Sequence, residues 1–218
     1  MKLTTIARLR SGYQSKFGTP RQSGLVDAEA RVVFEKEYRD ENMLRGITEY
    51  SHLWLVWGFS EIDGWSPTVR PPRLGGNKRV GVFATRSPFR PNPIGLTLVS
   101  LQRIEMTEDG VVLVVKGADM IDNTPIYDVK PYLPYVEAIT DAKGGFSDEV
   151  KGHKLEVVMP ECLQGVLGDT LNIIKEIIAQ DPRPAYQNDP LRVYAFEYEG
   201  YHVEFYVKEN TAYVKEIR

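Results

Sequence analysis

Three prolines crowd the segment between two apolar runs, residues 79–85 and 96–104, that are each typical of a buried strand. These prolines are Pro88, Pro91 and Pro93. Each fixes its own φ angle and pushes the residue before it toward extended geometry, so a stiff loop joins the two runs. Arg86 and Arg90 lie on that loop, which lowers the conformational entropy lost when a carboxylate or phosphate binds them. The alternative is a proline-rich turn with two solvated arginines.

Positive charge is concentrated in two parts of the chain. The whole sequence has 27 Lys and Arg against 30 Asp and Glu, a net charge of -3. Residues 64–104 nevertheless contain seven basic residues and no acid, and residues 1–26 contain five more, again without an acid. If these windows fold together, they form a positive face that attracts polyanions. The alternative is a solvated face whose charge is compensated by acids from elsewhere in the fold.

Composition limits the class of protein. With 218 residues and 42% hydrophobic content, the chain can bury the core of one large domain, or of one domain and a smaller one. It has one cysteine, Cys162, and three scattered histidines, so we expect no internal disulfide, no metal site and a cytoplasmic location. The longest apolar run, residues 53–59, is too short to span a bilayer, and we expect no membrane attachment.

The first 135 residues carry a pattern of short strands. The runs rich in Val, Ile, Leu and aromatic residues are 3–9, 31–34, 52–60, 79–85, 96–104, 111–116 and 126–129. One short helix is expected over residues 41–47. About seven strands without intervening helices favour an antiparallel barrel or sandwich over a doubly wound sheet. No GxGxxG motif follows a strand, so a Rossmann cofactor site is not expected.

The pattern changes after residue 135. A linker is predicted over residues 140–148, then a strand over 154–158 and an amphipathic helix from Pro160 to Asp181. Two or three strands over residues 192–215 complete the chain. We therefore expect a large domain over residues 1–140 and a small α+β domain over 141–218. The small unit is marginal by itself and needs another surface to cover its helix.

Five motifs carry a resemblance to a known family. They are FGTPRQSGL at residues 17–25, SHLWLVW at 51–57, PTVRPPRLGGNKRVGVFATRSPFRPNPIGL at 67–96, DMIDNTPIYDVKPYLPY at 119–135 and DPRPAY at 181–186. In this combination and order the chain resembles the TrmO family, also called TsaA-like or YaeB, of S-adenosylmethionine-dependent tRNA methyltransferases. The resemblance implies an antiparallel β-barrel followed by a small carboxy-terminal domain, in agreement with the strand pattern.

The resemblance also implies an activity and a cofactor site. The reaction would be methyl transfer to the exocyclic N6 of threonylcarbamoyladenosine, the base next to the anticodon, in a pocket completed across a homodimer interface. The residues implied for S-adenosylmethionine are Ser23, Gly24, Leu25, Ser60, Glu61, Arg86, Leu96, Gly117, Ala118 and Asp119. Two positions depart from the family pattern: Ser23 stands where proline is frequent, and Asn123 where glycine is frequent. A looser first loop and a left-handed Asn123 are therefore expected.

The chemistry needs proton removal and recognition of the threonyl group. The methyl donor is already activated, so the enzyme mainly aligns it with the nucleophile. A weakly nucleophilic nitrogen calls for a base, and the acids in the motifs are Asp119, Asp122, Asp128 and Asp181. Each of them is more often a cap or a loop acceptor. Arg183 and Arg90 are the candidates for the threonyl carboxylate. With Asp181 and Arg183, Tyr186 forms the predicted catalytic group, and we place its ring beside the target base.

The remaining predictions concern RNA and the aromatic strand. Arg70, Arg73, Lys78 and Arg79, with Arg90, are predicted to bind the tRNA backbone. His52 is interpreted as a hydrogen-bonded structural histidine. Trp54 and Trp57 lie three apart in a strand and should face opposite sides. The alternative function is a non-catalytic RNA-binding or S-adenosylmethionine-sensing barrel.

Overall fold

The structure is a computed structural model of the whole chain. It describes residues 2–71, 74, 78–108, 110–149, 152, 154–160, 163, 168–184, 187 and 189–218. Two predicted site residues, Arg73 and Tyr186, lie outside the described residues. In the described part of the chain, no helix combines the length and the apolar character needed to cross a bilayer.

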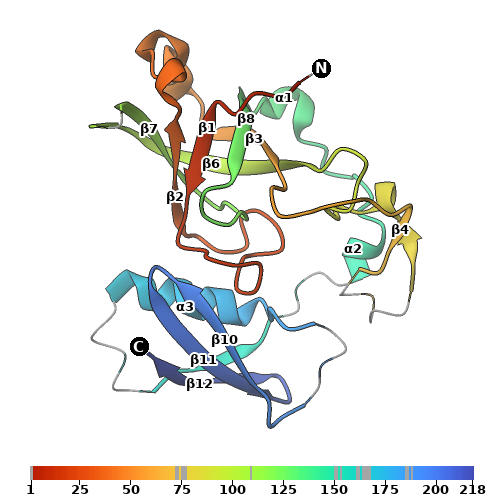
Figure 1. Cartoon of the computed structure of the whole chain (residues 1–218). Helices are drawn as coiled ribbons and strands as arrows, with labels where there is room; N and C mark the ends of the chain where they lie inside the picture. The colour runs from red at the N-terminus through yellow and green to blue at the C-terminus, as the bar shows by residue number, and fades with distance from the viewer. Residues whose placement is uncertain are drawn as a thin grey trace.

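Six antiparallel strands form the larger sheet. They are β1 (Ala7–Arg10), β2 (Glu29–Phe34), β3 (His52–Gly58), β6 (Ile94–Thr107), β7 (Gly110–Lys116) and β8 (Pro125–Pro131). The strands pair in the order β1-β2-β7-β6-β3-β8, and β8 pairs back with β1, so the sheet closes on itself as a barrel (Figure 1). The mainly β fold class predicted from the sequence is confirmed.

Alternation along β3 separates the inside of the barrel from its surface. Leu53, Leu55 and Trp57 are buried with the core residues of the other strands. Trp54 points to the other side, where its indole N–H donates to a Glu137 carboxylate oxygen at 3.0 Å. The prediction that the two tryptophans face opposite sides is thus confirmed. Because side chains alternate with a period of two, the barrel has a filled apolar interior and a separate outer face.

Two local predictions about the barrel segment were wrong. The run 79–85 joins no barrel strand: β5 (Val80–Gly81) pairs only with β4 (Thr68–Val69), and a 3-10 turn, η5 (Val82–Ala84), follows. After the 3-10 turn η1 (Lys36–Tyr38), the segment predicted as a helix over 41–47 forms two further 3-10 turns, η2 (Glu41–Leu44) and η3 (Ile47–Glu49). Gly46 interrupts the last two with a φ angle of 85°, which no helix accommodates.

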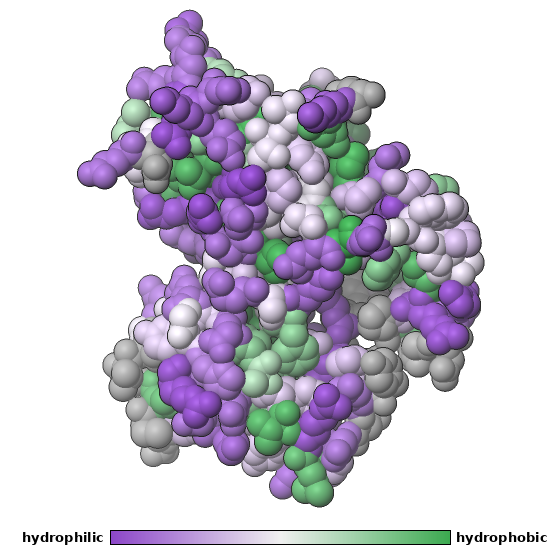
Figure 2. Space-filling model, in the orientation of Figure 1, coloured by the Kyte–Doolittle hydropathy of each residue, from purple (hydrophilic) through white to green (hydrophobic). Residues whose placement is uncertain are grey.

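The second unit is a helix packed on a four-stranded sheet. After two short helices, α1 (Pro134–Glu137) and α2 (Phe146–Glu149), come β9 (Glu156–Val158), α3 (Gly168–Ala179), β10 (Val193–Tyr198), β11 (Tyr201–Lys208) and β12 (Thr211–Ile217). The sheet order is β10-β11-β12-β9, with β9 parallel to β12. Ile174, Ile177 and Ile178 of α3 are buried against this sheet. Hydrophilic side chains cover much of the surface of both units (Figure 2).

A loop from the amino-terminal part belongs to the second core. Tyr13, Val26 and Ala28 are buried together with the helix and sheet of the second unit. Tyr13 forms a β-bridge with Tyr198, and the Glu199 amide donates to the Gly12 carbonyl at 3.0 Å. Residues 11–28 therefore lie between the barrel and α3 (Figure 1) and connect the two units within one chain.

Candidate functional site

Two glycine turns meet at one end of the barrel. The Gly24 amide donates to the Gly117 carbonyl at 3.0 Å, and the Gly117 amide donates to the Ala28 carbonyl at 3.3 Å. The φ angles of Gly24 and Gly117 are 71° and 82°. A Cβ atom on Gly117 would lie 3.2 Å from the Gly24 nitrogen, so the two backbones approach closely because Gly117 has no side chain. Two separate groups of predicted cofactor residues are thereby neighbours.

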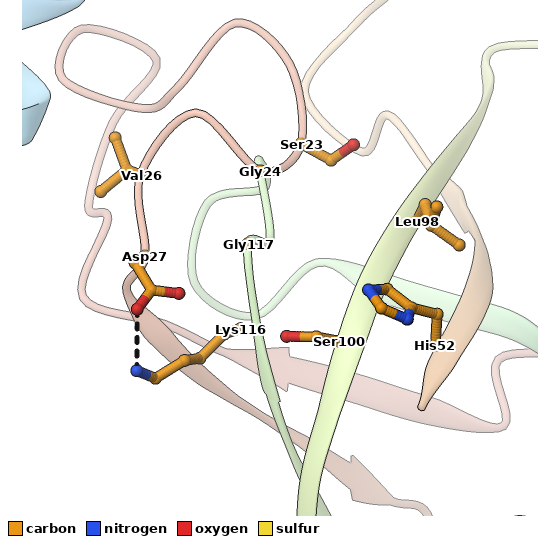
Figure 3. Close-up of a pocket in the computed structure, with 9 residues that line it drawn as sticks. All are labelled: Ser23, Gly24, Val26, Asp27, His52, Leu98, Ser100, Lys116 and Gly117. Carbon is orange, nitrogen blue, oxygen red and sulfur yellow. Dashed lines mark hydrogen bonds and ion pairs between the residues drawn. The ribbon is translucent and has the colours of Figure 1, made fainter. Parts of the chain in front are cut away.

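A hollow of about 230 Å³ opens beside these turns (Figure 3). It is lined by Ser23, Gly24, Val26, Asp27, His52, Leu98, Ser100, Lys116 and Gly117. The Lys116 ammonium pairs with the Asp27 carboxylate at 2.9 Å, and this hydrogen bond raises the pKa of Lys116. His52 on β3 pairs directly with Ser100 on β6, and both side chains lie along the hollow.

Several lining residues were missed by the sequence interpretation. His52 is exposed at the first position of β3, with Nδ1 2.9 Å from the Ser51 hydroxyl. It is thus hydrogen-bonded, as predicted, but it also borders the hollow. Ser100 and Lys116 were not considered, because no motif marks them. Their place follows from strand register, since Ser100 pairs with both His52 and Lys116.

Asp119, the last residue of the second glycine turn, is also the end of a buried chain of hydrogen bonds. The Trp57 indole N–H donates to the Thr97 hydroxyl at 2.9 Å, and that hydroxyl donates to a carboxylate oxygen of Asp119 at 2.7 Å. Burial raises the pKa of the Asp119 carboxyl, although the hydrogen bond from Thr97 and the positive charge of Arg86 both act in the opposite direction. The site therefore holds one partly desolvated carboxylate with an oriented donor.

The other predicted cofactor residues lie at the same end of the barrel or on the outer face of β6. The exposed Arg86 donates to the Gln22 side chain at 2.9 Å, which ties the proline loop to the Ser23–Gly24 turn. Ala118 is buried in the second turn. Ser60 and Glu61 are exposed in the loop after β3, where the Phe59 amide donates to the Pro93 carbonyl at 3.0 Å. Leu96 is 55% exposed on β6.

Acidic residues pair with some, but not all, of the described basic residues in the two segments 1–26 and 64–104. Arg8 pairs with Glu35 at 3.0 Å, and Arg103 pairs with Glu29 at 2.9 Å, as the alternative interpretation allowed. Arg70 and Arg79 flank the β4–β5 ribbon at one end, next to Lys78, and all three are exposed. Arg79 donates to the Thr68 hydroxyl at 3.0 Å. Within the described residues, none of the three pairs with an acid.

Arg90 stabilises the proline loop from within. Its guanidinium donates to the carbonyl oxygens of Val82 and Thr85, at 3.2 and 2.6 Å, and lies over the Phe83 ring at 5.6 Å. These contacts close the 3-10 turn that replaces the predicted strand. The arginine predicted to meet a substrate anion thus holds its own loop together.

The described residues of the DPRPAY motif, 181–184, lie against the first glycine turn. Arg21 donates to the carbonyl oxygens of Pro182 and Arg183, at 3.2 and 2.6 Å, and the Gln180 side chain donates to the Leu25 carbonyl at 3.3 Å. The motif was expected to lie against a barrel, with the partner subunit's barrel considered. The structure places it against residues 21–25 of the same chain.

Asp181 and Arg183 pair with each other. Both carboxylate oxygens of Asp181 accept from Arg183, at 2.7 and 2.9 Å, and Arg183 is 9% exposed. Asp181 has a φ angle of 49°, which orients the pair within the turn. Asp122 and Asp128 are also engaged: Asp122 accepts from the Ser11 amide at 3.0 Å, and Asp128 pairs with Lys130 at 2.7 Å. Among the described residues, no cluster of His, Cys, Asp or Glu could hold a metal ion.

Comparison with known proteins follows the same division of the chain. Residues 8–138 match the tRNA-methyltransferase O N-terminal domain, and residues 154–218 match the TrmO C-terminal domain. A tRNA (adenine(37)-N6)-methyltransferase from Eikenella corrodens is 48% identical over 77% of this chain and 97% of its own length. One of the same name from Escherichia coli is 42% identical over 84% of this chain and 82% of its own.

Solved structures give the same relationship at the level of the fold. The crystal structure of TrmO from Pseudomonas aeruginosa superposes with a TM-score of 0.79, at 28% sequence identity, over 100% of this chain and 98% of that one. The two domain matches, the two relatives and the superposition all point to one family. The chain belongs to the TrmO family.

Proposed function

We propose that this protein is an S-adenosylmethionine-dependent tRNA methyltransferase that modifies N6 of adenine 37, with threonylcarbamoyladenosine as the substrate base. The observation that carries the proposal is the meeting of the Ser23–Gly24 and Gly117–Asp119 turns beside the hollow. Its relatives are named tRNA (adenine(37)-N6)-methyltransferases, and a Pseudomonas aeruginosa relative, 37% identical, is named a putative S-adenosylmethionine-dependent methyltransferase.

The residues around the hollow fit such a cofactor. Glycine backbones form one edge, where amide and carbonyl groups can reach a ligand directly, and Leu98 supplies an apolar wall. S-adenosylmethionine supplies an activated methyl group when bound. The residues proposed to hold it are those of the two turns, Ser23, Gly24, Leu25, Gly117, Ala118 and Asp119, of which Ser23, Gly24 and Gly117 line the hollow. Ser60, Glu61, Arg86 and Leu96 are assigned to the same site from the family resemblance.

A second subunit is proposed to complete this pocket. At about 230 Å³ the hollow is smaller than the roughly 300–1,000 Å³ of pockets that enclose drug-sized ligands. The outer face beside it is apolar: Val56 pairs with Leu96 and Trp54 with Leu98, while Ile94 and Leu96 are 39% and 55% exposed. A homodimer that buries this face would close the hollow on its open side.

The tRNA is proposed to bind through the basic ribbon and the proline loop. Arg70, Lys78 and Arg79 are exposed and lack an acidic partner within the described residues, which leaves them available for phosphates. Arg73 and Arg90 are assigned the same role, Arg90 with its loop contacts retained. Binding that depends on such contacts weakens as salt is raised.

The DPRPAY motif is proposed to face the substrate base. Its hydrogen bonds to residues 21–25 bring Asp181 and Arg183 to the edge of the cofactor turn. Arg183 would orient the threonyl carboxylate, Asp181 would set the position of Arg183, and Tyr186 would pack on the base. Because Asp181 already neutralises Arg183, the substrate carboxylate must share or displace that pair.

Two wider assignments accompany the function. We propose that residues 1–140 and 141–218 act as two domains, since one hydrophobic cluster lies within the barrel and the other consists mainly of residues after 140, with Tyr13, Val26 and Ala28 joining it. We also propose that the protein works in the cytoplasm, where tRNA is modified.

Mass spectrometry of tRNA nucleosides tests the proposal. The protein is incubated with S-adenosylmethionine and threonylcarbamoylated tRNA, and with the same tRNA lacking that modification as the control. A methylated threonylcarbamoyladenosine in the first sample alone supports it. Cofactor binding without a methylated product would refute the enzyme and indicate a sensor or RNA-binding protein instead.

A further inference from the structure

A buried hydrogen-bond chain connects the barrel interior to the second glycine turn. Trp57 Nε1 is 2.9 Å from Thr97 Oγ1, which is 2.7 Å from Asp119 Oδ1. Thr97 and Trp57 are 2% and 7% exposed. Neither of them was among the predicted site residues, and Thr97 lies on β6 between Leu96 and Leu98, whose side chains point outward.

The direction of this chain is fixed by the chemistry of its members. An indole N–H can only donate, so the Thr97 hydroxyl must accept from Trp57 with a lone pair. Its single proton is then free for Asp119, and the ionised carboxylate accepts it. The indole therefore determines the orientation of the hydroxyl, and the hydroxyl determines which Asp119 oxygen is occupied.

Packing holds the first member of the chain in place. Trp57 lies over Gly95, where a Cβ atom would be 2.1 Å from the indole Cε2, and its ring centroid is 4.2 Å from that of Phe59. The indole therefore fills the space that a side chain at position 95 would occupy. Thr97 is β-branched, with a restricted χ1, so the whole chain is rigid before any ligand binds.

The far end of the chain fixes the turn that lines the hollow. Ala118 and Met120, on either side of Asp119, are buried, and Gly117 accepts from Gly24. Because the Asp119 side chain is anchored to β6, residues 117–119 cannot shift along the barrel end. Any group bound at the two glycine turns therefore meets a preformed surface.

We propose that Thr97 is a positioning residue of the cofactor site: its hydroxyl, oriented by Trp57, fixes the Asp119 carboxylate and with it the turn that receives S-adenosylmethionine. This inference rests on the proposed function. Removing the hydroxyl leaves the carboxylate partly buried without its donor, which weakens ligand binding by releasing the turn.

Titration gives a readout that simple loss of packing would not change. The charged and titratable groups facing Asp119 are Arg86, whose charge favours its ionised form, and Tyr13, which burial keeps neutral by raising its pKa. The Thr97 hydrogen bond lowers the pKa of Asp119. Without it the carboxyl protonates at higher pH, so cofactor affinity should fall at a higher pH on acidification.

The experiment compares Thr97→Val, which removes the hydroxyl at nearly constant shape, with Thr97→Ser, which keeps it. Isothermal titration with S-adenosylmethionine should give an affinity about tenfold lower for Thr97→Val and within about twofold of the parent for Thr97→Ser. The acid limb of the affinity profile should move to higher pH only in Thr97→Val. Thr124→Val is the matched control, since Thr124 is equally buried and donates only to the Ile121 carbonyl.

Each outcome decides one question. Parental affinity and an unchanged pH profile in Thr97→Val would overturn the positioning role and leave the proposed function intact. A parent protein that does not bind S-adenosylmethionine would refute the proposed function itself. Should Thr97→Val not fold, Trp57→Phe removes the orienting N–H instead; an affinity about threefold lower supports the inference, and an unchanged one overturns it.

Discussion

Replacing Gly117 by alanine tests the contact between the two glycine turns. The φ angle of Gly117 is 82°, a conformation that costs an L residue about 1–2 kcal/mol. The new Cβ atom would lie 3.2 Å from the nitrogen and 3.3 Å from the Cα atom of Gly24, and neither backbone atom can rotate away. The turns must separate, which weakens the hydrogen bond between them. We expect a total loss of about 2–3 kcal/mol of unfolding free energy.

Gly46→Ala is the matched control for the backbone strain. Gly46 has a φ angle of 85°, but a Cβ atom there meets nothing within 4 Å. It should lose only the strain, about 1–2 kcal/mol. In thermal unfolding each kcal/mol corresponds to about 2–4 °C for a chain of this size, so the two variants are distinguishable. Calorimetry with S-adenosylmethionine should show weakened binding for Gly117→Ala alone. Equal stability losses and equal affinities would refute the idea that the close approach shapes the cofactor site.

Three further predictions concern other contacts. Arg183→Ala removes the bidentate partner of the Asp181 carboxylate and should cost about 2–3 kcal/mol in urea unfolding; a raised KM for tRNA would support the proposed contact with the threonyl carboxylate, and unchanged stability would show that the pair does not hold the turn. Gly95→Ala places a Cβ atom in the space of the Trp57 indole and should lower the free energy of unfolding in urea by about 1–3 kcal/mol. A variant as stable as the parent would show that the indole can move. The hydrogen bond with the Glu197 carboxylate raises the pKa of His202, so the stabilisation from this pair is complete below the unfolded pKa of about 6.5 and is lost as pH rises through the folded pKa. The midpoint of thermal unfolding should show this decline in the parent and not in His202→Gln.

Much of the fold was readable because it depends on local patterns. Alternation placed Trp54 and Trp57 on opposite faces. The asparagine at 123, where the resembled family often has glycine, predicted a left-handed conformation, which its φ angle of 63° confirms. The motifs also marked both glycine turns, although only the structure shows that they touch. The run 79–85 misled the prediction because apolar residues next to prolines fit a 3-10 turn as well as a strand.

The site depends on relations that no local pattern contains. Lys116 and Ser100 border the hollow because of strand register, which is set by pairs far apart in sequence. The contact of Thr97 with Asp119 could likewise be predicted only from the strand register. The partner of Arg183 was two residues away, yet the bidentate pair with Asp181 requires the left-handed turn at residue 181, which nothing in the motif announces.

Residues 11–28 belong to the amino-terminal part of the chain but pack with the second unit, so the two units cannot be separated without exposing this segment. A fragment ending at residue 140 would keep every barrel strand but leave Tyr13, Val26 and Ala28 in water, since their packing partners come from the second unit. Val26 also lines the hollow proposed for the cofactor, so that hollow would lose support as well. Amide exchange in residues 18–28 should therefore report the docking of α3, and S-adenosylmethionine affinity should decline in the fragment although its barrel is complete. On the proposed assignment of the cofactor site, the smaller unit is part of the scaffold for a site that lies on the larger one.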